Sequence, residues 1–394
     1  MMHLPGYAAR AVERLEQAGF ETWAVGGCVR DSLRGIRPHD WDLCTAAAPE
    51  EMLRVFEGEQ VIETGLKHGT LTVMLDGSPL EITTYRTDGG YSDGRHPDGV
   101  RFVRSIREDL ARRDFTVGAM AWHPERGLFD PFEGQNDLKN RILRAVGDPD
   151  TRFTEDALRI LRLYRFAARF GFALDAATAR AARQLAPHLD CISAERIQEE
   201  LAKLLAAPQP GAYLEPAVLA VVLPELTPAA LEAAKPVVDA CPAGTEDLPV
   251  RWAALLMSLG EDGTRKALKR LRCSNTCIEQ TAVLVRGMGG SGGRFLLGHE
   301  KGHSIALPTA CGSRVPPQRI ICFGNCRPAI PSRAFLFCAF SIAHFKGTRR
   351  TNRRDFCGQS AERSKKFLYN LDKLPHSVIN LDLYDVRSYF MSLK

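Results

Sequence analysis

Two aspartates stand one residue apart in the stretch PHDWDLCTAA, as Asp40 and Asp42 on either side of Trp41. In a β-strand their side chains would share one face while the indole turned into the core. Two carboxylates on one face repel each other, and a divalent cation between them is the usual remedy. The stretch therefore predicts a metal-binding carboxylate pair, with a solvated turn as the alternative because Pro-His-Asp also suits turns.

A candidate phosphate cradle precedes this pair in the segment AVGGCVRD. Gly26 and Gly27 end a predicted strand and open a helix, so backbone N–H groups can approach an anion where the helix dipole favours negative charge. Arg30 adds a charge-assisted contact. Phosphates beside a carboxylate-bound metal indicate a nucleoside triphosphate with Mg²⁺. The alternative is a glycine-containing strand-to-helix turn that binds no ligand.

A third acid, Glu81 in LEITTYR, lies on a later predicted strand, on the face opposite Leu80 and Ile82. It is a candidate catalytic partner for the metal or for a 3′-hydroxyl group, or else an ordinary outward-facing glutamate. The long glycine-rich loop 86–100 carries Arg95 and His96 as candidate substrate contacts, because such loops are often functional.

The block EDLARRDFTVGAM contributes another arginine and acid to the candidate site. We expect Arg112, Arg113 and Asp114 to begin a helix that Asp114 caps, with Arg113 free to reach phosphate or sugar. Phe115 and Met120 are more simply core residues.

The block RFTEDALRILRLYRFAARFG contains Glu155, Asp156 and Arg159 on a predicted helix. Asp156 and Arg159 are three residues apart, so they should be neighbours on one face. An accepting carboxylate and a donating guanidinium suit the amino group and ring nitrogen that cytosine and adenine present, and reject uracil and guanine. A surface salt bridge is the alternative.

These residues are embedded in alternating helix and strand signals as far as about residue 145. A predicted helix over Tyr7 to Ala18 leads to strand TWAVGG, a helix over Val29 to Leu33, strand DWDLCT, helix PEEMLRVF and strands VIETG, GTLTVML and LEITTYR. From about residue 151 to 286 the pattern is helical. Past Gly287 the periodicity disappears.

Composition places the 394-residue chain among ordinary globular proteins, with a formal net charge of +5 that is compatible with a polyanionic partner. No apolar run reaches membrane-spanning length, and the first residues read as an amphipathic helix rather than a signal peptide. We expect a cytoplasmic protein whose eleven cysteines, which lack paired spacing, are mostly reduced and buried.

The chain resembles a known family. GGCVRD, DWD, HGTLTV, EITTYR, YSDGRHP, RRDFT, EDALRILRLYRF and SAERIQEEL occur in the order and spacing of bacterial CCA-adding enzymes, the class II tRNA nucleotidyltransferases, and of similar bacterial poly(A) polymerases. The resemblance covers about residues 5 to 285. It implies an α+β polymerase-β-like nucleotidyltransferase head over 1–145, a helical neck with a nucleotide-selecting template over 146–206, a helical RNA-binding body over 207–288, and an atypical tail over 289–394 for which partial disorder is one expectation.

The resemblance also implies the activity and the roles of the candidate residues. The enzyme would add the 3′-terminal CCA to tRNA from CTP and ATP, with two Mg²⁺ ions and release of pyrophosphate. Asp40 and Asp42 resemble the metal carboxylates. The implied nucleotide-binding set is Gly26, Gly27, Arg30, Arg113, Asp114, Glu155, Asp156, Arg159 and Arg162. The alternatives are a poly(A) polymerase, an A-adding enzyme, or a catalytically impaired RNA-binding relative.

Three departures from the family pattern stand out. Gly118 replaces the usual Asn of the RRDFTxNA block, and a glycine inside a helix costs about 1 kcal/mol relative to Ala. Met257 and Ser258 replace a metal-binding His-Asp pair, so we predict no phosphatase activity. Residues 289 to about 372 do not resemble the family, although LPHSVINLDLYDV after them does, which motivates a hypothesis of a compensated frameshift. A zinc site built from Cys322, Cys326, Cys338 and Cys357 is the less favoured interpretation of this tail.

Overall fold

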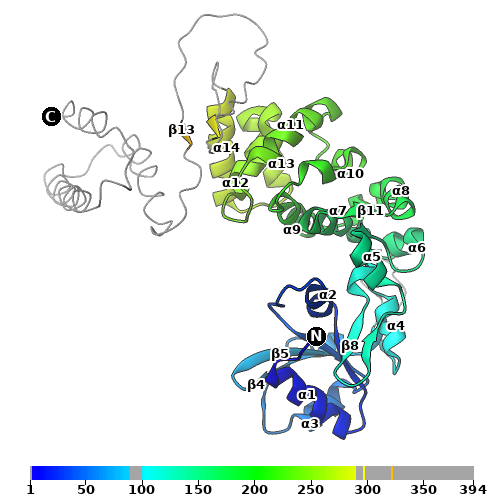
Figure 1. Cartoon of the computed structure of the whole chain (residues 1–394). Coiled ribbons are helices and arrows are strands. Elements are labelled where there is room, and N and C mark those ends of the chain that lie inside the picture. Colours follow the sequence, from blue (N-terminus) through cyan, green and yellow to red (C-terminus); the bar gives the residue numbers. More distant parts are fainter. Residues whose placement is uncertain (1, 89–99, 290–295, 298–320, 323–394) are drawn as a thin grey trace, which may run out of the picture. The chain divides into compact units, whose positions relative to one another are not determined.

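A computed structural model of the chain describes residues 2–88, 100–289, 296–297 and 321–322 (Figure 1). Arg95 and His96 lie outside the described residues, as do nearly all of the predicted tail, three of the four cysteines of the candidate zinc site and the segment on which the frameshift hypothesis depends. Within the described part, no helix is long and apolar enough to cross a membrane.

A seven-stranded mixed sheet forms the head. The order is β3 (Gln60–Ile62), β4 (Thr70–Leu75), β5 (Ser78–Thr84), β2 (Asp42–Thr45), β1 (Thr22–Val25), β8 (Ala121–His123) and β9 (Gly127–Phe129). Strands β2 and β5 are parallel, and the other neighbouring pairs are antiparallel. The strands predicted from the sequence are therefore confirmed, with bounds that are shorter or shifted, as for β5, which begins two residues earlier than predicted.

Helices cover both faces of this sheet. The helices α1 (Gly6–Gln17) and α3 (Pro49–Val55) contact each other and share the strand β4 (Figure 1). Because side chains alternate along a strand, Leu43 of β2 joins their core, whereas Cys44 packs in a second cluster with Leu110 of α4 (Ile106–Ala111). A sheet buried on both faces explains why β1 is buried throughout.

Shorter elements connect the head strands. They are α2 (Gly27–Leu33), η1 (Leu66–His68), β6 (Arg86–Asp88), β7 (Val100–Phe102), η2 (Thr116–Gly118), α5 (Gly134–Asn140) and β10 (Ile142–Leu143). The strand β10 pairs in parallel with β11 (Ala173–Leu174), which lies beyond the first helices of the next region.

The described residues after Asp148 are mainly helical, as the apolar periodicity predicts. The α-helices are α6 (Pro149–Glu155), α7 (Leu158–Phe170), α8 (Ala176–Gln184), α9 (Ala194–Leu205), α10 (Pro216–Val222), α11 (Pro228–Ala240), α12 (Leu248–Leu256), α13 (Gly260–Arg270) and α14 (Asn275–Gly289). The 3₁₀ helices are η3 (Ala186–Cys191), η4 (Gly211–Tyr213) and η5 (Met257–Leu259). Two short strands, β12 (Leu296–Leu297) and β13 (Ile321–Cys322), pair in parallel. The α+β class with following helices is confirmed.

Candidate active site

The carboxylates predicted to act together meet at the start of β2. Asp42 opens this strand and lies in register with Glu81 on the parallel strand β5. Asp40 precedes the strand, with its carboxylate 80% exposed and 2.8 Å from the His39 Nδ1. The prediction that Asp40 lies within the strand is therefore wrong, because pairing with β1 and β5 begins only after Trp41. Trp41 is buried, as expected, although it precedes the strand.

Burial and neighbouring charges both act on the Asp42 carboxyl group. Burial raises the pKa of its carboxyl group, the charges of Glu81 and Asp40 raise it further, and the Arg113 guanidinium opposes them. The pKa therefore responds to both other predicted catalytic acids, which indicates that all three share one electrostatic environment. Crowded like charges of this kind are an environment that a cation would relieve.

The glycine pair at the start of α2 makes room for Arg113. Gly26 has a φ of +74°, which favours glycine, and a Cβ there would lie 2.9 Å from the Arg113 Nη1. A Cβ on Gly27 would meet the Arg30 Nη2 at an ordinary 3.6 Å. The first glycine is thus required by both the backbone and an arginine from another predicted block.

Arg30 is held by groups of the protein itself. Its Nε and Nη2 each donate to Asp31 at 2.9 Å, and its guanidinium carbon lies 4.7 Å from the centre of the Phe170 ring. The side chain is nearly buried. A phosphate contact would therefore be made by an arginine that is already oriented by a carboxylate and a ring.

The segment 112–114 differs from its prediction. Arg112 ends α4 as its C-cap, so the segment does not begin a helix. From Asp114 onward the backbone pairs with distant residues: the Val146 N–H donates to the Asp114 carbonyl at 3.1 Å, and the next residue, Phe115, bridges Ala145. The Asp114 carboxylate caps no helix. It accepts from the Arg159 Nε at 3.0 Å and pairs with the Arg162 Nη2 at 2.8 Å.

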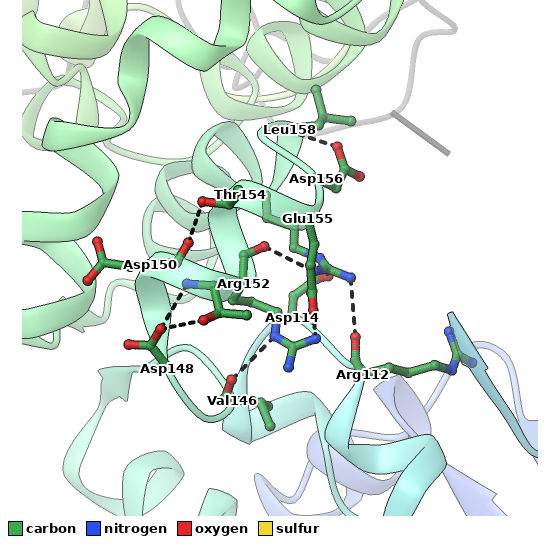
Figure 2. Close-up of polar contacts among 12 residues, drawn as sticks. Arg112, Asp114, Val146, Asp148, Asp150, Arg152, Thr154, Glu155, Asp156 and Leu158 are labelled. Atoms are coloured by element: carbon green, nitrogen blue, oxygen red, sulfur yellow. Dashed lines mark hydrogen bonds and ion pairs between the residues drawn. The ribbon is translucent and has the colours of Figure 1, made fainter. Parts of the chain in front are cut away.

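A helix break separates the two residues predicted to read the base. Helix α6 ends at Glu155, Asp156 is extended with φ −141° and ψ 103°, and α7 begins at Leu158. The prediction that Asp156 and Arg159 lie on one helical face is wrong. The Asp156 Oδ1 accepts from the Leu158 N–H at 3.0 Å (Figure 2), and its Oδ2 accepts from the Arg196 Nη2 at 3.0 Å.

Arg159 is buried and binds several groups at once. In addition to its bond to Asp114, it donates through Nη1 to the Glu155 Oε2 at 2.6 Å and to the Arg152 carbonyl at 3.0 Å. Its Nη2 donates to the Arg112 carbonyl at 3.3 Å. The structure thus joins the RRD and EDxxR blocks through the ion pairs of Arg159 with Asp114 and Glu155.

Two residues of this network were missed in the sequence. Asp109 binds the arginines that follow it three and four residues later, a helical spacing that could have suggested the contact. Arg196 contacts Asp156 across 40 residues of chain, and no local signal predicts such a pair.

Gly118 has a milder setting than predicted. It ends the three-residue turn η2 rather than lying inside a helix, and its carbonyl oxygen accepts from the Arg113 Nη1 at 3.4 Å. A Cβ there would meet no atom within 4 Å. A side chain at this position would therefore fit, and the penalty of a glycine in a helix interior does not apply.

Comparison with known proteins identifies the family. Residues 22–144 match the model of the "Poly A polymerase head domain", and residues 171–230 match the "Probable RNA and SrmB- binding site of polymerase A". The CCA-adding enzyme of Limosilactobacillus fermentum is 37% identical over 324 residues, which are 78% of this chain and 80% of that protein. The chain belongs to the CCA-adding enzyme family.

Other members of the CCA-adding enzyme family are similar over different lengths. The one from Leuconostoc mesenteroides is 46% identical over 202 residues, 51% of this chain and 50% of that protein. The crystal structure of the Bacillus stearothermophilus CCA-adding enzyme in complex with CTP is 35% identical, with a TM-score of 0.62 and coverage of 72% of this chain and 69% of that chain. The Thermotoga maritima enzyme complexed with tRNA, 24% identical with a TM-score of 0.56, shares the fold.

Proposed function

We propose that this chain builds the 3′-terminal CCA of tRNA by transferring CMP and AMP from CTP and ATP to the RNA 3′-hydroxyl group. The observation that carries the proposal is the 37% identity that spans 80% of a CCA-adding enzyme. A poly(A) polymerase is the second candidate, because the head matches a domain model described by that activity.

The carboxylates fit Mg²⁺. Among the described residues no three His, Cys, Asp or Glu side chains are already gathered around a metal position. Mg²⁺, however, needs only one or two carboxylates when waters and substrate phosphates complete its shell. Asp42, whose pKa is raised by burial and by two acidic neighbours, and the exposed Asp40 would hold it. Bound there, the metal would lower the pKa of the RNA hydroxyl and offset charge on the triphosphate.

The chain's own groups would hold the triphosphate and the ribose. We propose that the backbone at Gly26 and Gly27, with Arg30, receives the phosphates, where Asp31 and Phe170 keep the Arg30 side chain in place. The Arg113 Nη1 lies beside Gly26, and the Asp42 charge raises the pKa of Arg113, so its guanidinium can offset phosphate charge close to the carboxylates. Asp114 would contact the ribose while its carboxylate stays paired with Arg159 and Arg162 of the neck. We propose Glu81 as the third catalytic acid, from its register with Asp42.

Base selection would fall to the residues around the helix break. Each Asp156 oxygen accepts one hydrogen bond and can accept a second, so the carboxylate can receive the amino group of cytosine or adenine without losing Leu158 or Arg196. Arg159 would supply the donor to the ring nitrogen, with Glu155 and Arg162 fixing the charges around it. Leu158 and Arg196 thus hold Asp156, whereas Glu155 pairs with Arg159, so the two proposed template residues are fixed by different partners.

The division of labour along the chain follows from these roles. We propose that the head (1–145) carries out transfer, the neck (146–206) selects the nucleotide, and the body (207–288) binds RNA. The tail (289–394) is assigned no role. The proposed location is the cytoplasm, where tRNA and both triphosphates meet.

The test uses Mg²⁺, CTP and ATP with three tRNA transcripts that end before the first C, before the second C and before the terminal A. We expect each transcript to be completed to CCA and extended no further. A long A ladder would support a poly(A) polymerase, and addition of A alone would support an A-adding enzyme. The Asp42→Asn variant should still bind tRNA but extend none of the transcripts, whereas no extension by the wild-type protein would contradict all three activities.

A further inference from the structure

Asp109 is a fully buried carboxylate surrounded by donors. Its side chain, on α4, is 0% exposed. The Oδ1 accepts from the Arg112 Nε and Nη2 at 3.0 and 2.9 Å and from the Arg86 backbone N–H at 3.3 Å. The Oδ2 accepts from the Arg113 Nη2 at 3.2 Å, and the Cys44 thiol lies 3.7 Å from it. One acid therefore fixes two adjacent arginines at once.

The second of these arginines points into the candidate active site. The Arg113 Nη1 lies where a side chain on Gly26 would clash, and the Arg113 and Asp42 charges each shift the other's pKa, upward for the guanidinium and downward for the carboxyl. The Arg113 Nε is buried with no hydrogen-bond partner among the described residues. The orientation of the guanidinium depends instead on the hydrogen bond from Nη2 to Asp109 and on the weaker contacts to Cys44 and to the Gly118 carbonyl.

We propose that Asp109 is a positioning residue for nucleotide transfer, whose buried carboxylate holds the Arg113 guanidinium between Gly26 and Asp42. The inference rests on the proposed function, because it assigns Arg113 to the bound nucleotide. Asp109 itself touches no substrate. It acts through Arg113. Its Oδ1 also fixes Arg112, whose carbonyl oxygen accepts a hydrogen bond from Arg159.

Loss of the Asp109 charge has a specific consequence for Arg113. A buried cation without its counter-ion moves toward the next available anion, and in this site that anion is Asp42. A guanidinium drawn onto Asp42 would compete for a carboxylate assigned to the metal and would leave the phosphates. An Asp109→Asn variant keeps the size of the side chain, so it separates this effect from loss of packing.

The alternative is that Asp109 only anchors α4 to the sheet. A structural anchor would lower the melting temperature and the fraction of folded enzyme without changing the affinity of folded enzyme for CTP. The readout must therefore be affinity, together with its dependence on Arg113.

The experiment measures equilibrium binding of CTP with Mg²⁺ and the kcat and KM of tRNA extension for the wild-type protein, Asp109→Asn, Arg113→Ala and the double variant. We expect Asp109→Asn to weaken CTP binding and raise its KM about tenfold or more, since a charge-assisted hydrogen bond is lost. In the Arg113→Ala background, the same change should leave CTP affinity within about twofold, because the two residues act as a unit.

A matched control is Glu16→Gln in the same head. The Glu16 carboxylate likewise accepts two hydrogen bonds from one arginine, Arg126, at 3.0 and 2.5 Å, and one from the Thr22 backbone N–H at 2.8 Å. These contacts do not include Arg113. The control variant should lower the melting temperature while leaving the CTP affinity unchanged. If Asp109→Asn behaves like this control, or if its effect persists in full without Arg113, the inference is overturned although tRNA extension by the wild-type protein still stands. A wild-type protein that neither binds CTP nor extends tRNA would instead overturn the proposed function.

Discussion

At the residue scale, the protonation of Asp42 reports how closely the candidate carboxylates interact. Replacing Glu81 by Gln removes a negative charge that raises the pKa of the Asp42 carboxyl group, so that pKa should fall toward its ordinary value. The carboxyl ¹³C chemical shift of Asp42, followed through a pH titration of the metal-free protein, measures it directly. Glu59→Gln, which removes a carboxylate paired with Arg14 elsewhere in the head, should leave the Asp42 pKa unchanged.

Removal of the positive charge of Arg113 should shift the Asp42 pKa in the opposite direction. Arg113→Ala removes the cation that lowers the Asp42 pKa, so this variant should raise it. Binding of a metal to Asp42 requires the ionised carboxylate, so the acid limb of the activity profile should move to lower pH in the Glu81→Gln enzyme wherever activity remains. An unchanged Asp42 pKa in that variant would contradict the shared environment of the two acids.

The same residues show what the sequence can and cannot predict about a site. Alternation along the strands put Asp42 and Glu81 forward as members of one site, and the two residues are in register on the neighbouring strands β2 and β5. That they act together stays a prediction. The shared helical face expected for Asp156 and Arg159 is wrong because the prediction assumed a continuous helix. The break at Asp156 is accompanied by a bond to Arg196, 40 residues away, and such a partner leaves no local pattern.

At the element scale, Arg251 joins α12 to the end of α9 and the segment after it. Its fully buried guanidinium donates to the carbonyl oxygens of five residues and meets no carboxylate among its hydrogen-bond partners; the five are Leu205, Ala207, Pro208, Cys241 and Pro242. Helix ends leave carbonyls without partners, and here one arginine satisfies several of them. Burial lowers its pKa from the usual arginine value.

Replacing Arg251 by Met should therefore destabilise the helical region strongly. The methionine fills much of the space, but the buried carbonyl oxygens lose their donors, and we expect a loss of about 3 kcal/mol in the free energy of unfolding. Urea unfolding followed by circular dichroism measures it. Arg270→Met, at a half-exposed position that pairs with Glu225, should cost about 1 kcal/mol or less. Equal losses in both variants would contradict the assigned role of Arg251.

Elements with strong periodicity were the predictable ones. Alternating apolar residues marked β4 and β5, and the buried face of α1 follows the helical repeat through Ala8, Ala11, Val12 and Leu15. The segment 112–114 was predicted as a helix start from its charged residues. Its last residue, Asp114, instead opens the segment 114–116, which runs beside residues 144–146, and this pairing between distant parts of the chain overrides the local preference.

At the scale of the whole molecule, charge connects the fold to the proposed RNA substrate. The chain carries 52 Lys and Arg against 47 Asp and Glu. Many of the described head arginines are paired with acids, as Arg30, Arg112 and Arg113 are, so the modest excess of positive charge must act through residues that remain exposed. A protein that binds tRNA mainly through phosphate contacts releases counter-ions, and its affinity then falls with salt.

We therefore expect tRNA binding to weaken steeply as KCl rises. With as few as about three phosphate contacts, a fourfold increase in salt should reduce the affinity roughly forty-fold. Filter binding or fluorescence anisotropy at several KCl concentrations gives the slope, and sucrose at matched osmolality should leave the affinity unchanged because it screens no charge. The Asp42→Asn variant should show the same slope as the wild-type protein, since this residue is assigned to the metal and not to the RNA backbone. An affinity that does not change with salt would mean that bases or shape, rather than phosphates, dominate recognition, and would remove the charge argument for RNA binding along the helical body.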